Sequence, residues 1–116
     1  MAPPTAPTDS VLEDLAEVVG RLWQAADLAF DAAGPDGDLE LDLLSITARD
    51  AAWTGADLMG AHRSLCNTVR VSAASDPLEL IRAAEQVLAS RPIEQWPPGT
   101  SRLVVDVCDL IGEYAR

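Results

Sequence analysis

The amino-acid sequence predicts an all-α protein, a compact bundle of about four helices. Apolar residues recur at steps of three and four over long segments, which is the period of a helix with one buried face. Aromatic residues make up only 4% of the chain, and small and aliphatic residues are abundant. Such a composition suits close helix packing better than strands. Helix start and stop signals also divide the chain into segments of helical length.

The first helix is predicted over residues 10–33. Ser10 and Glu13 have the spacing at which each side chain caps the backbone N–H of the other. Acidic residues near this start also favour the positive end of the helix dipole. Gly34 and Pro35 end the helix, because proline cannot continue its hydrogen-bond ladder.

A second helix is predicted over residues 38–72, because Asp38 is a good N-cap and apolar residues then keep a helical spacing over most of that range. Its first residues, 39–44, alternate leucine with acidic residues, which is also the period of a strand. The longer helical pattern favours a helix. A continuous helix of this length would measure ~50 Å, so the sequence allows a kink or break near residues 54–55.

Two shorter helices are predicted over residues 77–90 and 100–115. An Asp-Pro pair at residues 76–77 provides an N-cap followed by proline at the first helical position. In the last helix, residues 103–107 also fit a strand, although a two-stranded sheet with 39–44 would be marginal alone. Trp96 lies in the proline-rich connection between these helices and is expected to fold back onto the core.

One helical domain is expected over residues 9–116, after a disordered tail at residues 1–8, which contain three prolines and no apolar period. Neither a secretory signal nor a segment apolar enough to span a bilayer is found, so a cytoplasmic protein is expected. All eight Lys and Arg residues are arginine, a bias that suggests a bacterium with a high-GC genome.

The acidic charge lies mainly in the N-terminal half. The net charge is −11, and residues 9–42 hold ten acidic residues against one arginine. Such a surface repels phosphates, so direct binding to nucleic acid or to an anionic membrane is not expected. The simplest interpretation of this charge is solubility.

No catalytic residue, cofactor or metal site is predicted. The chain has a single histidine and lacks the short motifs of the common hydrolases, zinc proteases and nucleotide-binding proteins. His62 and Cys66 are spaced to share one helix face, and Cys108 would add a third zinc ligand. That face also carries apolar residues and no fourth ligand is evident. We therefore expect these residues in the core, and we expect a protein that is not an enzyme.

Trp53, Thr54 and Gly55 form a W-x-G tripeptide in an alanine-rich helical chain of this size. In this respect the sequence resembles the small secreted WXG family of type VII substrates. The resemblance implies a helical hairpin with the tripeptide at its turn. The sequence departs from the family pattern at residues 34–35, which break the preceding helix too early. It also lacks the C-terminal export signal, since no acidic residue follows Tyr114.

By elimination, the sequence predicts a small protein-binding, regulatory or accessory module. Its binding surface is expected on the acidic N-terminal half, where Trp23 or Trp53 would anchor a protein partner with a basic surface. Asp36, Asp38 and Glu40 complete the candidate surface. The high apolar content of so short a chain also makes self-association into a homodimer reasonable. The alternatives are an acidic mimic of DNA that occupies the groove of a basic DNA-binding protein, and a WXG-like secreted protein.

Overall fold

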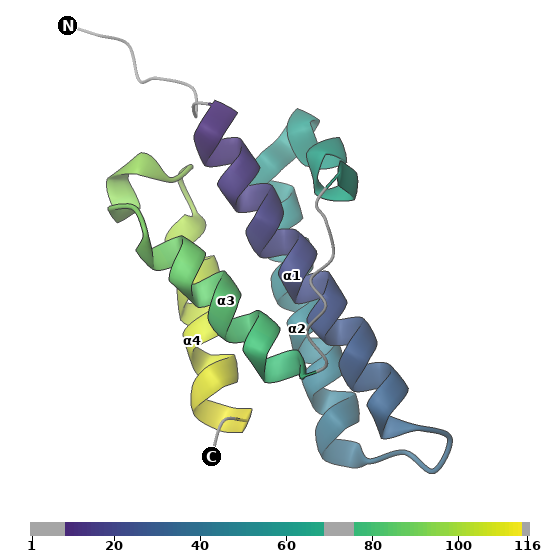
Figure 1. Ribbon diagram of the computed structural model, residues 1–116. Helices are drawn as coiled ribbons and strands as arrows, with labels where there is room; N and C mark the ends of the chain where they lie inside the picture. The colour runs from purple at the N-terminus through teal and green to yellow at the C-terminus, as the bar shows by residue number, and fades with distance from the viewer. Residues whose placement is uncertain (1–8, 69–75, 115–116) are drawn as a thin grey trace, which may run out of the picture.

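A computed structural model describes residues 9–68 and 76–114 of the chain (Figure 1). Within these residues the chain forms four α-helices and two 3₁₀ segments, and no strand. The elements are α1 (Asp9–Ala33), α2 (Leu39–Met59), η1 (Gly60–Thr68), α3 (Pro77–Ala89), η2 (Ile93–Gln95) and α4 (Thr100–Tyr114). The predicted all-α fold class is confirmed. The expected disordered tail, residues 1–8, lies outside the described residues.

The four helices pack as two antiparallel pairs. Figure 1 shows α1 and α2 joined by a tight turn, with α3 and α4 beside them as the second pair. α1 packs against α2 and α3, and α4 packs against the same two helices, so α1 and α4 lie at opposite corners of the bundle. In the described parts of the chain, no helix is both long enough and apolar enough to cross a membrane.

Small side chains let α1 and α2 approach closely. Several alanines of the two helices are almost or completely inaccessible to solvent, among them Ala25, Ala26, Ala29, Ala48, Ala51 and Ala52. Ser45 lies among them, and its Oγ donates a hydrogen bond of 2.8 Å to the carbonyl oxygen of Ala26. This bond satisfies a hydroxyl that burial would otherwise leave unpaired, so a polar residue is tolerated in the interface between the two helices.

The predicted second helix is interrupted at Gly60. The helix α2 passes through residues 54–55 without a break and ends at Met59. Gly60 has a φ of 54°, in the left-handed region that glycine adopts readily, and the chain continues from there as the 3₁₀ segment η1. The break therefore occurs at the glycine that has the positive φ, five residues after Gly55, where the sequence allowed it.

The W-x-G tripeptide lies inside α2 and not at a turn. The turn between α1 and α2 is at residues 34–37, where Gly34 and Gly37 have φ values of 69° and 68°. The placement of Trp53 that the resemblance to the WXG family implies is therefore not found. Residues 39–44 and 103–107, for which the sequence left a strand open, are both helical.

The expectation that Trp96 packs onto the core is confirmed. Its side chain is 4% exposed, and its Nε1 donates a hydrogen bond of 3.2 Å to the carbonyl oxygen of Leu88. The guanidinium of Arg91 lies 6.0 Å from the centre of the indole ring. Arg91 also donates to Asp14 on α1 through its Nε, at 2.8 Å. The connection before α4 is thus attached to both α3 and α1.

Candidate protein-binding surface

Large apolar side chains are exposed together on the α1–α2 pair. Among the described residues, four of them lie on α2 and one on α1. We call these five residues the apolar strip, and their exposed fractions are 62% for Phe30, 71% for Leu39, 44% for Leu43, 55% for Ile46 and 49% for Trp53. Two further exposed side chains of this kind lie elsewhere, Ile93 on η2 and Val105 on α4.

The α2 members of the strip share one side of the helix. Leu39, Leu43, Ile46 and Trp53 follow one another at steps of four, three and seven, which keeps side chains in one row along a helix. The opposite side of α2 faces the core with Leu44, Ser45 and several alanines. With apolar residues on both sides, α2 is the least amphipathic of the four α-helices.

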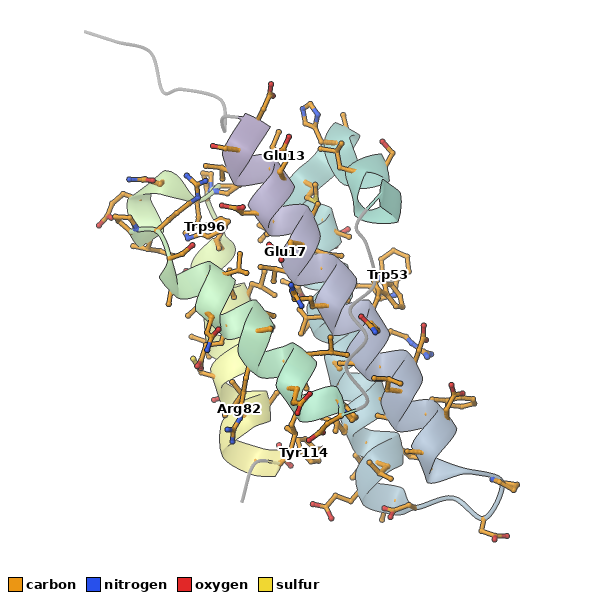
Figure 2. The ribbon with its side chains drawn as sticks, in the orientation of Figure 1. Glu13, Glu17, Trp53, Arg82, Trp96 and Tyr114 are labelled. Carbon is orange, nitrogen blue, oxygen red and sulfur yellow. The ribbon has the colours of Figure 1, made fainter. Side chains whose placement is uncertain are left out.

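A pair of tryptophans joins the strip to α1. The rings of Trp23 and Trp53 meet edge to face, with 5.4 Å between their centres and 75° between their planes. Phe30 follows Trp23 by two turns of α1, and Ile46 precedes Trp53 by two turns of α2. Because the helices are antiparallel, Phe30 and Ile46 lie on the same side of the tryptophan pair, toward the turn. Figure 2 shows Trp53 on the side of the α1–α2 pair that faces away from α3 and α4.

Acidic residues surround the strip. Residues 9–59 hold twelve acidic residues and two arginines, a net charge of −10, whereas residues 60–116 hold seven acidic residues and six arginines. Exposed Asp27 and Asp31 lie on α1 near Phe30 in the sequence. On α2, Asp50 and Asp57 occupy the same row as Ile46 and Trp53 and are exposed. The main feature of this surface is an apolar row that carboxylates border on α1 and interrupt on α2.

The residues predicted from sequence as partner contacts have different roles. Trp53 belongs to the apolar strip, and Trp23 packs half-buried against it. Asp38 caps α2, since its Oδ1 accepts a hydrogen bond of 3.2 Å from the backbone N–H of Leu41. Asp36 is exposed in the turn and Glu40 is exposed in the first turn of α2. The structure thus brings the two tryptophans together and gives Asp38 a structural task.

Sequence reasoning missed the rest of the strip. The sequence does not indicate Phe30, Leu39, Leu43 or Ile46 as partner contacts. The leucine alternation at residues 39–44 left a strand open there, although the longer pattern favoured a helix. The alternation has another cause: Leu39 and Leu43 face solvent while Leu44 faces the core. The signal for the strip residues of α2 is a second apolar row at steps of three and four on the same helix.

The residues considered as zinc ligands lie in different surroundings. His62 is exposed and lines a shallow pocket with Asp9 and Glu13 of α1, contrary to the expectation that it is buried in the core. The reason is the break at Gly60, after which the α-helical period no longer applies. Cys108 was also expected in the core but is exposed, because Leu103, Val107 and Leu110 form the buried side of α4. The side chain of Cys66 is outside the described residues. Within the described residues, no three His, Cys, Asp or Glu side chains are placed to hold one metal ion.

A groove of about 300 Å³ runs between α2 and α4. Its charged lining is mainly acidic: Asp50, Arg102, Asp106, Asp109 and Glu113. On the opposite side of α4, Cys108 lies 3.6 Å from the Oε2 of Glu85 on α3. Partial desolvation of the thiol raises the pKa of Cys108 above its ordinary value of 9.0, and the hydrogen bond and negative charge of Glu85 raise it further. A raised pKa disfavours the thiolate, which is the reactive form.

Comparison with protein-family models, with curated proteins and with solved structures gave no match. Function is therefore inferred from the geometry of the surface.

Proposed function

We propose that the chain is a non-enzymatic protein-binding module and that a partner protein docks on the apolar strip. The observation that carries this proposal is the gathering of five large exposed apolar side chains on the α1–α2 pair. Soluble monomers rarely expose apolar side chains as a contiguous patch, and such patches usually mark interaction sites.

The strip lies outside the core of the bundle. The core-facing side of α2 buries Leu44, Ala48 and Met59, and of the strip residues Trp53 contacts α1 through Trp23. Trp53 has the properties of an interface anchor: it is large, held in place by Trp23 and half open to solvent. Tryptophan is enriched among the residues that dominate binding energy.

Mimicry of DNA is less well supported. A mimic presents carboxylates at positions where a basic groove expects phosphates, and it has no use for apolar side chains between them. Here the strip interrupts the acidic surface. In addition, Glu17 on α1 accepts a hydrogen bond of 2.7 Å from the Nη2 of Arg21, which partly neutralises one of the carboxylates that a mimic would present.

Site-specific photo-crosslinking in the producing cells tests the proposal. A photoreactive phenylalanine analogue replaces Leu43 in the strip, and in a control it replaces Val105, an exposed apolar residue on α4. We expect a defined crosslinked product from position 43 that is absent from position 105. The same products from both positions, or none from position 43, would show that the strip is not a docking surface.

A further inference from the structure

We infer that the occupant of the apolar strip is an amphipathic helix of a different protein, with arginine or lysine on both sides of its apolar row. This inference rests on the proposed function and specifies the partner for the same surface. It follows from three features of the α1–α2 pair: the spacing of the strip, the charge at its edges, and the repulsion that a second copy of this chain would meet.

The strip has the length and spacing of a helix-binding surface. Leu39 and Trp53 are separated by four turns of α2, a length of ~21 Å, which a partner helix of ~15 residues would match. Steps of four, three and seven place the strip side chains in a row into which apolar residues of a second helix can insert. Phe30 and Trp23 extend this row from α2 onto α1. An extended strand offers side chains at a period of two, which does not match this row.

Carboxylates beside the strip and within its row specify the charge of the partner helix. On the α1 side, Asp27 and Asp31 are exposed. On α2, the exposed Asp50 and Asp57 alternate with Ile46 and Trp53 along the row, and Arg49 is the cation of that helix. A helix that inserts its apolar row here would bring its flanking side chains next to these carboxylates. Basic flanks are therefore attracted, and acidic flanks are repelled.

The same charge argues against a second copy of this chain as the occupant. Two α1–α2 pairs that met through their strips would each bring a net charge of −10. Like charges that face each other across an interface oppose association. A partner with the opposite charge avoids this repulsion and also gains a faster encounter rate, which falls as salt is added.

The test uses the full chain and three synthetic peptides of ~15 residues, a length that gives four helical turns. The first has leucines at i, i+4, i+7 and i+11 with lysine and arginine on both sides of that row. The second has glutamate in place of every cation. The third has the composition of the first in an order that scatters the leucines around the helix. Binding to each is measured by isothermal titration calorimetry near physiological salt.

We expect the first peptide to bind at least about tenfold more tightly than either of the others. Failure of the first peptide to bind, or equal binding of the acidic peptide, overturns the inference. Equal binding of the scattered peptide also overturns it, because charge alone would then explain the interaction, as it would for a DNA mimic.

Matched variants of the chain locate the site. Ile46 and Val105 have the same exposed fraction, 55%, but only Ile46 belongs to the strip. Ile46→Ser should weaken binding of the first peptide about tenfold, whereas Val105→Ser should leave it unchanged. Replacing Asp27 and Asp31 together by asparagine should weaken binding and make it less sensitive to salt. Equal effects of the two serine variants would place the peptide elsewhere.

Sedimentation velocity at low and high salt tests whether a second copy of this chain occupies the strip. A dimer that Ile46→Ser abolishes and Val105→Ser preserves would identify a second copy of this chain on the strip and overturn the inference. The proposed function can survive this failure. A crosslinked partner at Leu43 together with no peptide binding would keep the docking surface and reject the basic helix, whereas no crosslink and no binding would reject both.

Discussion

Gly55 on α2 approaches Val19 on α1 so closely that a methyl group added to Gly55 would lie 2.6 Å from the Cγ2 of Val19. That distance is well inside van der Waals contact, so α1 and α2 can pack at their present separation because residue 55 has no side chain. The contact lies two residues from Trp53. Trp53 contacts α1 as well, since its ring meets that of Trp23 edge to face.

Replacing Gly55 with alanine should destabilise the protein. Alanine has the higher helix propensity, worth ~1 kcal/mol. Its methyl group would overlap Val19 and also lie 3.4 Å from Leu103 on α4, and overpacking of this kind costs about 1–3 kcal/mol. We expect a net loss in the free energy of unfolding, measured by urea denaturation.

Gly112→Ala is the matched control for this substitution. Gly112 lies on α4, and nothing is within 4 Å of the position that its Cβ would take. Here the propensity gain is unopposed, so the variant should be more stable by about 0.5–1 kcal/mol. If Gly55→Ala proved as stable as Gly112→Ala, the close approach of α1 and α2 at Gly55 would be contradicted.

Trp96→Phe should destabilise the connection before α4. Phenylalanine keeps most of the buried ring but removes the N–H that bonds to the Leu88 carbonyl oxygen, and loss of a buried hydrogen bond costs about 1–3 kcal/mol. Trp53→Phe removes an indole from the exposed strip and should change the stability by less than about 0.5 kcal/mol. Thermal unfolding followed by circular dichroism distinguishes the two. Equal losses of stability in the two variants would mean that Trp53 stabilises the fold as much as Trp96 does, which would contradict its assignment to a docking surface.

Asp38 and Asp36 should differ in their effect on stability. Asp38→Ala removes the side chain that accepts a hydrogen bond from the Leu41 N–H, and loss of such an N-cap costs about 1 kcal/mol. Asp36→Ala, in the exposed turn two residues earlier, should stay within about 0.5 kcal/mol of the parent. Urea denaturation of both variants provides the comparison. A larger loss for Asp36→Ala would contradict the assignment of Asp38 as the cap.

Glu85→Gln should make the thiol of Cys108 more reactive. Desolvation of the thiol, together with the hydrogen bond and charge of Glu85, raises the pKa of Cys108 above 9.0. Removing the charge of Glu85 lowers this pKa and increases the thiolate fraction at a given pH. The rate of alkylation, followed as pH rises toward 9.0, should increase in the variant. The measurement is made with Cys66 replaced by serine, so that one thiol reacts.

Glu94→Gln serves as the control, because Glu94 is exposed on η2. The alkylation profile of this variant should match that of the parent, and a similar increase would mean that net charge rather than Glu85 acts on the thiol.

The raised pKa of Cys108 also makes the stability of the fold depend on pH. Since the folded protein holds the proton of Cys108 more tightly than the unfolded chain, this contribution to stability is complete below pH 9.0 and is lost as pH rises through the raised pKa.

The helix boundaries follow largely from local signals in the sequence. Asp38 and Asp76 cap α2 and α3 as predicted, with side-chain oxygens that accept from backbone N–H groups three and two residues later. The turn at residues 34–37 ends α1 as expected. Capping and turn formation involve residues that are neighbours in the chain, which is why their signals can be recognised without knowledge of the fold.

The proposed docking surface was only partly predictable. Trp23 and Trp53 were predicted as anchors, because few other residue types combine size with a preference for interfaces. The leucines and isoleucine of the strip were not, because an apolar residue at helical spacing normally faces a core. On α2 the apolar residues occupy both sides of the helix, and the sequence does not say which side the other helices cover.

The sequence by itself determined the all-α class, the start of each helix and the concentration of acidic charge in the first half of the chain. Only the tertiary structure decided that α2 ends at Gly60 and runs uninterrupted through Gly55, that His62 faces solvent, and which apolar side chains remain exposed. The reason is physical. Caps, turns and charge act between residues close in sequence, whereas burial depends on how α1, α3 and α4 pack around α2, and those contacts join residues far apart in the chain.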